Sequence, residues 1–357
     1  SRARAVDGRQ RVGCVSAEPA VTAVQTPAPA APTGRRVRRA ADVGTLVERA
    51  REGDARSVAR LISLVEDASP LLREVAAALA PHTGRARVLG LTGPPGVGKS
   101  TTTTALVRAF RQAGQRVGVL AVDPSSPFSG GALLGDRVRM QDHAGDSGVY
   151  IRSMASRGHL GGLAWATPQA LRVLDAAGCD VVLIETVGVG QSELEVASLA
   201  DTTLVLLAPG MGDGIQAAKA GILEVADVFV VNKADRDGAD QTVRDLRAML
   251  SLGGRHTQTG AWRPPIVKTI ASRDSGSGVE DVVARIEEHA AWLASSGEDQ
   301  RRRVERAARE VEAIALAGLR ERMGDVHGSA ALGVLAEQVV AGETDPYRAA
   351  DELVAQL

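Results

Sequence analysis

The residues best suited to chemistry in this chain form the octapeptide Gly93-Pro-Pro-Gly-Val-Gly-Lys-Ser100. It matches the pattern GxxxxGK[ST], whose glycines let the backbone wrap a phosphate while successive amides point inward at a helix N-terminus. Lys99 is expected to reach the β- and γ-phosphates, and Ser100 to ligate Mg²⁺. A chance glycine-rich turn is disfavoured, because an apolar run precedes the motif and a helical stretch follows it. The predicted phosphate-binding set is Gly93, Gly96, Val97, Gly98, Lys99, Ser100 and Thr101.

A second motif, Asn232-Lys-Ala-Asp235, follows an apolar run and has the pattern NKxD. The Asp235 carboxylate can accept hydrogen bonds from N1–H and the 2-amino group of guanine, a pair of donors that adenine lacks. Asn232 can bond the N7 edge of the purine and tie loops together, and the stem of Lys233 can cover the ring face. Alone, NKxD is a common strand-end loop. Downstream of the phosphate motif, it predicts a guanine nucleotide, GTP or GDP.

A third stretch, Leu183-Ile-Glu-Thr-Val-Gly-Val-Gly-Gln191, ends an apolar run in a carboxylate and then glycines. Glu185 is placed to hold Mg²⁺ directly or through water, and Gly188 to offer its amide to the γ-phosphate. Gln191 could orient the attacking water. The alternative is a strand-end glutamate that caps the following helix.

The loop from Asp123 to Asp136 follows another apolar run and is rich in Gly, Ser and Pro. This composition predicts a mobile loop that brings the Asp123 and Asp136 carboxylates near the phosphates and the metal. The alternative is a solvated loop whose aspartates cap turns. Arg139 either bridges the phosphates or lies on a helix surface, and the sequence leaves both open.

Continuous apolar runs alternate with helical stretches between residues 85 and 295. Strands covered on both faces have this pattern, so we predict an α/β fold with a mostly parallel, doubly wound sheet. Helical spacing in 42–84 and 296–357 predicts N- and C-terminal helical extensions, and the composition of 1–41 predicts a disordered tail. The expected strands lie at 88–91, 117–122, 181–184, 203–207, 228–231 and 266–270.

Composition narrows the classes of function. The 357 residues carry 42 basic and 43 acidic side chains, and this net charge of −1 provides no global field for nucleic acid or an anionic membrane. The two cysteines, Cys14 and Cys179, provide neither a disulfide scaffold nor a CxxC metal pair. No apolar run approaches the roughly 20 residues of a membrane helix. We therefore expect a cytoplasmic protein, and the mitochondrial matrix is the less favoured alternative.

Taken together, the motifs resemble the MeaB/ArgK/MMAA family of P-loop GTPases from about residue 42 to the C-terminus. The most distinctive stretches are AVDPSSPFSGGALLGDRVRM and IETVGVGQSE, beside GPPGVGKS and NKAD. The resemblance implies a SIMIBI-type P-loop NTPase fold and GTP hydrolysis with Mg²⁺. It assigns phosphate and metal roles to Lys99, Ser100, Asp123, Asp136 and Glu185.

The resemblance also implies partners. The family assists adenosylcobalamin-dependent acyl-CoA mutases, typically methylmalonyl-CoA mutase, and an adenosyltransferase is an optional third component. The C-terminal helices resemble the dimerisation arm of the family, so a homodimer is expected. Packing of these helices on their own GTPase domain is the alternative.

Two segments depart from the family pattern. The stretch from Gly212 to Gly221 resembles switch III, a mobile region that communicates with the mutase, and Asp213 and Lys219 match its charged positions. Relatives often carry Gly and a second basic residue where this chain has Ala217 and Ala220.

The other departure is Ala271-Ser272-Arg273, which stands where a Ser-Ala loop usually touches the guanine O6. Backbone amides of Ala271 and Ser272 can still make that contact, so the prediction of guanine stands.

The favoured function is a GTPase chaperone whose nucleotide cycle gates cofactor loading into the mutase and removal of inactivated cofactor. A P-loop kinase or ATPase of the ArgK transport-system type is the enzymatic alternative, but no acceptor site or base is identifiable. A nickel-type metallochaperone would need Cys/His clusters, and the six histidines are scattered. A signal-recognition GTPase would need a Met-rich groove, which five methionines cannot build.

Overall fold

The computed structural model describes most of the chain from residue 42 onward. The described residues are 42–67, 69–124, 143, 145–156, 166–186, 192–210, 222–252, 260–274, 277–323 and 330–355. The tail expected at 1–41 lies outside this part of the chain and stays a prediction.

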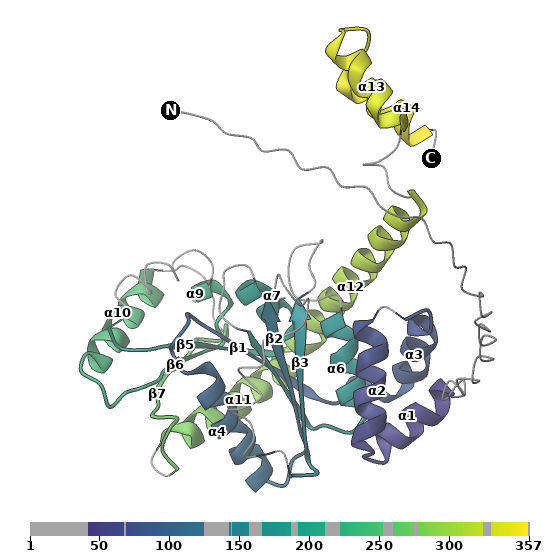
Figure 1. The fold of residues 1–357 in the computed structure, drawn as a ribbon. Coiled ribbons are helices and arrows are strands. Elements are labelled where there is room, and N and C mark those ends of the chain that lie inside the picture. The colour runs from purple at the N-terminus through teal and green to yellow at the C-terminus, as the bar shows by residue number, and fades with distance from the viewer. Residues whose placement is uncertain are drawn as a thin grey trace, which may run out of the picture. The chain divides into compact units, whose positions relative to one another are not determined.

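A seven-stranded sheet organises the described residues (Figure 1). Its strand order is β3-β2-β4-β1-β5-β6-β7, and every neighbouring pair is parallel. From β1 the chain first builds one side of the sheet with β2, β3 and β4 and then the other side with β5, β6 and β7, so the doubly wound α/β fold is confirmed. The strands are β1 (Arg87–Thr92), β2 (Val117–Pro124), β3 (Val149–Ser156), β4 (Val181–Thr186), β5 (Thr202–Leu207), β6 (Val228–Val231) and β7 (Ile266–Lys268).

Helices cover both faces of this sheet, which explains the continuous apolar runs. One face packs against α4 (Lys99–Gln112) and α11 (Val279–Ser296). The other packs against α6 (Ala166–Ala176) and α7 (Ser192–Leu199), while α10 (Ala239–Leu252) covers β5 and β6. All six residues of β4 are buried, as expected for a strand between two helical layers.

The edge strand β3 is the one strand of this sheet that the sequence patterns did not predict. Tyr150 and Met154 are buried, but Arg152 lies between them on the same face and pairs with Glu66. A strand that pairs with only one neighbour tolerates such a polar residue, and its apolar run is interrupted.

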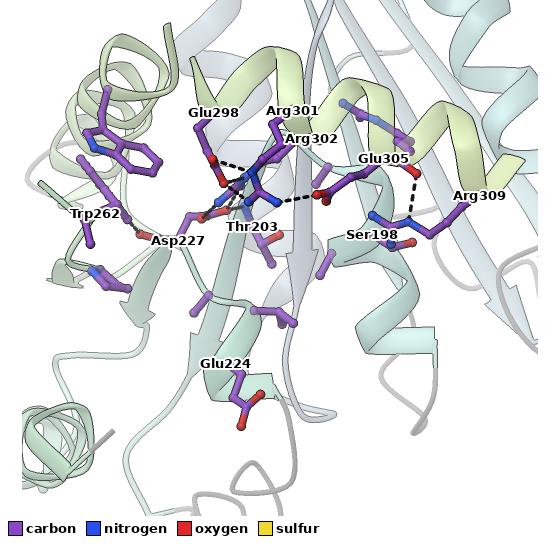
Figure 2. A pocket seen from close by; sticks show the side chains of 18 of the residues that line it. Ser198, Thr203, Glu224, Asp227, Trp262, Glu298, Arg301, Arg302, Glu305 and Arg309 are labelled. Atoms are coloured by element: carbon purple, nitrogen blue, oxygen red, sulfur yellow. Dashed lines mark hydrogen bonds and ion pairs between the residues drawn. The ribbon is translucent and has the colours of Figure 1, made fainter. Parts of the chain in front are cut away.

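Helix α12 (Glu298–Met323) is held to the sheet by arginines (Figure 2). Arg302 donates to the Asp201 carbonyl at 3.0 Å and to the two carboxylate oxygens of Asp227 at 3.1 and 3.3 Å. Arg306 donates to Asp201 Oδ1 at 2.5 Å and to the carbonyl of Leu199. Asp201 and Asp227 directly precede β5 and β6, so α12 is attached at the amino ends of these strands.

The C-terminal helices expose apolar side chains. On α12 these are Val304, Val311, Ile314, Leu316 and Leu319. Helices α13 (Ala330–Val340) and α14 (Pro346–Ala355) pack on each other. Within the described residues, every helix is too short or too polar to cross a membrane.

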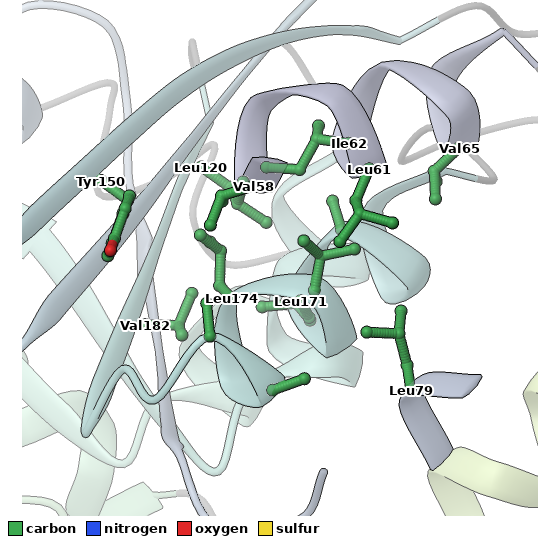
Figure 3. Close-up of a cluster of buried hydrophobic side chains, with 14 of the residues drawn as sticks. Val58, Leu61, Ile62, Val65, Leu79, Leu120, Tyr150, Leu171, Leu174 and Val182 are labelled. Atoms are coloured by element: carbon green, nitrogen blue, oxygen red, sulfur yellow. The ribbon is translucent and has the colours of Figure 1, made fainter. Parts of the chain in front are cut away.

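The N-terminal helices α1 (Val43–Arg51), α2 (Ala55–Glu66) and α3 (Leu72–Leu79) share one hydrophobic core with a face of the sheet. A short 3₁₀ turn, η1 (Ala80–His82), links α3 to the segment before β1. Apolar residues at helical spacing on α2 pack near Leu171 and Leu174 of α6 (Figure 3). Those residues are Val58, Leu61, Ile62 and Val65.

Candidate nucleotide-binding site

The predicted phosphate loop joins the carboxyl end of β1 to the start of α4. Gly93 has a φ of +140°, and a Cβ there would stand 2.2 Å from the Leu206 carbonyl oxygen. Gly98 has a φ of +96°, and a Cβ there would stand 2.4 Å from Asn232 Nδ2. Glycine is therefore required at both positions by backbone conformation and by close approach.

Lys99 opens helix α4 and is almost fully buried, with 7% of its surface exposed. Its Nζ donates to the Gly93 carbonyl at 2.7 Å and to the Pro94 carbonyl at 3.1 Å. The ammonium thus lies against the loop predicted to bind phosphate. Of the remaining loop residues, Val97 is buried and Thr101 is exposed.

Glu185 lies at the carboxyl end of β4, beside β1 in the sheet. Its side chain is buried, and its two carboxylate oxygens accept from different hydroxyls of α4. Ser100 Oγ donates to Oε1, and Thr103 Oγ1 donates to Oε2 at 2.6 Å. The fold therefore brings together Ser100 and Glu185, two of the four residues predicted to hold Mg²⁺.

Asn232 joins the phosphate loop to two other segments. Its Nδ2 donates to the Val97 carbonyl at 2.9 Å. Its Oδ1 accepts from Thr269 Oγ1 and from the Ala271 amide, each at 3.1 Å. Asn232 and Thr269 are both buried, so this network is shielded from water. The predicted role of Asn232 in tying loops together agrees with these contacts.

The rest of the NKxD motif lies at the same edge of the sheet. Lys233 has a φ of +57°, unusual for a residue with a side chain, and its Nζ donates to the Gly96 carbonyl at 2.5 Å. Asp235 is exposed. Ser272 is exposed as well. The backbone N–H of Ala271 donates to Asn232, so in this structure that amide secures its own loop.

Several predicted site residues cannot be placed. Asp136, Gly188 and Gln191 lie outside the described residues, as do Arg139 and the segment with Asp213 and Lys219. Asp123 is described by its backbone alone, as the next-to-last residue of β2. The roles given to these residues stay predictions.

Two residues at this edge escaped the sequence analysis. Thr103 follows Ser100 by three positions in α4, and residues three apart share one face of a helix. This spacing could have predicted that both hydroxyls lie beside the same group. Thr269 follows β7 and reaches Asn232 only because β6 and β7 are neighbours, which no local pattern shows.

The residues present fit a Mg²⁺ ion, because the Ser100 hydroxyl and the Glu185 carboxylate supply the hard oxygen ligands that this ion prefers. A metal site built from His, Cys, Asp and Glu alone is a different matter. In the described ranges, no three or more of these side chains are grouped so that they could hold a metal ion.

A cavity of about 810 Å³ lies at the opposite, amino edge of the strands (Figure 2). Asp227 lines it and is surrounded by Arg302, the ring of His289 at 3.3 Å and the indole N–H of Trp262, which donates to the Asp227 carbonyl at 2.7 Å. Burial alone would raise the pKa of the Asp227 carboxyl, but His289 and Arg302 more than offset this, and the pKa is lowered. The carboxylate is thus held ionised at the base of α12.

Comparison with known proteins agrees with this geometry. The family model described as "Methylmalonyl Co-A mutase-associated GTPase MeaB" matches residues 58–326. A protein of Pyrococcus abyssi that its name assigns to the GTPases is 46% identical over 318 residues, which span 88% of this chain and 97% of that relative.

Two further proteins are similar. The mitochondrial methylmalonic aciduria type A homolog of Mus musculus is 41% identical over 213 residues, covering 59% of this chain and 50% of the mouse protein. The crystal structure of an LAO/AO transport system kinase superimposes with a TM-score of 0.67 at 26% identity, over 88% of this chain and 96% of that chain.

Proposed function

Because the chain belongs to the MeaB family of P-loop GTPases, we propose that it is a GTP-dependent chaperone of an adenosylcobalamin-dependent acyl-CoA mutase. The family is one of GTPases, so hydrolysis of GTP is its reaction. The mutase is proposed as the partner because the family description associates the GTPase with methylmalonyl-CoA mutase. In this proposal the nucleotide cycle gates cofactor loading and the removal of inactivated cofactor.

The roles of the binding residues follow from their present contacts. Lys99 exchanges its neutral carbonyl acceptors for the β- and γ-phosphates, because charge-assisted hydrogen bonds are the stronger ones. Asp235 is exposed and available to the guanine edge. Mg²⁺, when bound by Ser100 and Glu185, would neutralise charge on the phosphate oxygens. Ser100 can offer a lone pair to the ion and still donate its proton to Glu185.

Partner-dependent hydrolysis is the central feature of the proposal. The side chains that the structure describes at this edge carry ammonium groups, hydroxyls, carboxylates and an amide, and their contacts hold the loops of the site together. Catalysis of phosphoryl transfer depends mostly on positioning and charge, so ordering of the remaining loops by a partner could accelerate hydrolysis by several orders of magnitude.

We also propose that the chain works as a homodimer. Support comes from α12, which exposes Val304, Val311 and Leu319 along its length. Residues spaced seven and eight apart return to one side of a helix, so they form an apolar stripe suited to a second copy. The purified full chain should then sediment as a dimer.

The test is GTP turnover with and without methylmalonyl-CoA mutase. We expect slow hydrolysis alone and clear acceleration with mutase. Lys219→Ala should blunt this acceleration while leaving basal turnover and GTP affinity intact. Lys268→Ala is the matched control, because Lys268 is a surface lysine paired with Asp240. Its response to mutase should stay unchanged.

Two outcomes would count against the chaperone. One is fast hydrolysis by the isolated wild type with no response to mutase. The other is transfer of the γ-phosphate to an acceptor molecule in place of release as inorganic phosphate, which would favour the kinase alternative.

A further inference from the structure

Thr103 stands out among the four consecutive threonines at the start of α4. Its side chain is fully buried, and its Oγ1 lies 2.6 Å from Glu185 Oε2 and 3.1 Å from the Lys99 carbonyl oxygen. Thr102 is equally buried, but its hydroxyl donates to the Gly98 carbonyl, at 3.0 Å. The two residues therefore share burial and the bond to the preceding turn, and differ in the contact with the carboxylate.

The Thr103 hydroxyl has a single proton, so it can donate to only one of its two neighbouring oxygens at a time. A hydroxyl donates one hydrogen bond, and the shorter contact to an ionised acceptor is the stronger one. The proton therefore goes to Glu185 Oε2, and the Lys99 carbonyl is the weaker contact. Ser100 occupies the other oxygen, Oε1. Because Ser100 and Thr103 each bond a different oxygen of Glu185, the orientation of this carboxylate is fixed.

We propose that Thr103 is a positioning residue that holds Glu185 in the orientation needed for Mg²⁺. The inference rests on the metal-binding role proposed for Glu185. When Ser100 turns a lone pair to the ion, Thr103 still fixes Oε2, so the carboxylate keeps its place. Partners that orient a metal-binding carboxylate contribute to metal affinity without touching the metal, and their loss typically costs about 10- to 100-fold.

The experiment measures Mg²⁺ affinity directly. Binding of a fluorescent, non-hydrolysable GTP analogue is followed as free Mg²⁺ is titrated, for wild type, Thr103→Val, Thr103→Ser and Thr102→Val. Thr103→Val should raise the half-saturating Mg²⁺ concentration by about 10- to 100-fold. Its affinity for the analogue in EDTA should stay within about twofold, because the Thr103 hydroxyl bonds Glu185 and the Lys99 carbonyl oxygen and leaves the Lys99 ammonium on its own partners.

The other variants separate positioning from simple damage to the helix. Thr103→Ser keeps the hydroxyl and should restore the wild-type Mg²⁺ response. Thr102→Val loses the same type of helix bond and should leave that response unchanged. Equal Mg²⁺ responses of Thr103→Val and Thr102→Val would overturn the inference, as would a Thr103→Val defect that is just as large in EDTA. If Thr103→Val does not fold, Thr103→Ala replaces it, with the same expectations.

Glu185→Gln distinguishes failure of this inference from failure of the site. If Glu185→Gln shifts the Mg²⁺ titration and Thr103→Val does not, only the role of Thr103 is wrong. If Glu185→Gln leaves the titration unchanged, the metal site itself is wrong and the role of Thr103 falls with it.

Discussion

Replacing Asn232 by alanine should disconnect three segments of the nucleotide site. The amide side chain bonds the Val97 carbonyl, the Thr269 hydroxyl and the Ala271 backbone N–H. Alanine would leave all three groups without this partner in a buried place. Each buried polar group left unpaired costs about 1 to 3 kcal/mol.

The low end of this range applies, because water can enter the space that the amide leaves. Three groups then amount to about 3 kcal/mol, or roughly 150-fold in an equilibrium constant. In a chain of 357 residues, that loss lowers the midpoint of thermal unfolding by roughly 4 °C. The segments with Val97 and Ala271 are those predicted to meet phosphate and base. GDP must therefore reorder them, and its affinity should fall by at least about tenfold.

Thermal unfolding of the nucleotide-free protein and titration with GDP measure both effects. Thr269→Val is the matched control, because it removes one of the three bonds and should cost about 1 kcal/mol. Once Asn232 is alanine, Thr269→Val should cost little more, since the hydroxyl has already lost this acceptor. Equal losses for the two single variants, or strict additivity in the double variant, would refute the reasoning.

Two further predictions concern the base and the amino edge of the sheet. Asp235→Asn should favour xanthine over guanine nucleotides by about 5- to 150-fold, because an amide can donate to the C2 oxygen of xanthine. Nucleotide competition measures this preference, and an unchanged preference for guanine would contradict the prediction. Arg302→Met should lower the free energy of unfolding near pH 7 by about 2 to 3 kcal/mol. The pKa of Asp227 is lowered in the folded state, so its ionised carboxylate stabilises the protein at any pH above the pKa of the unfolded chain. That stabilisation is lost as the pH falls through the pKa of the folded state. The Arg302→Met deficit should therefore shrink in denaturant unfolding below about pH 4, and a deficit independent of pH would contradict the ionised role of Asp227.

The sequence predicted those parts of the molecule that depend on local patterns. The strand at 228–231 coincides with β6, and Gly93 to Ser100 joins a strand to a helix as the motif requires. Continuous apolar runs were reliable because both faces of the sheet are covered. Strand β3 was missed because Arg152, which pairs with Glu66, interrupts its apolar run in a strand with a single neighbour in the sheet.

Contacts between distant segments were harder to predict. The NKxD pattern assigned Asn232 a role in tying loops, but its partners Thr269 and Ala271 are set by the order of strands in the sheet. The same holds for Asp227, whose partner Arg302 lies on a helix that the sequence predicted only as part of the C-terminal extension. The roles of Asp123 and Asp136 depend on a loop beyond the described residues and stay predictions.

The attachment of α12 has a consequence for synthesis on the ribosome. Arg302 and Arg306 lie 75 and 105 positions after their partners Asp227 and Asp201. At about 5 to 20 residues per second, Asp227 is made roughly 4 to 15 seconds before Arg302. The sheet and α11 can therefore fold first, and α12 docks only after both of its aspartate partners have been made. A product truncated before Glu298 would lack both arginines and leave Asp227 without its guanidinium, which makes such a fragment less stable than the finished protein.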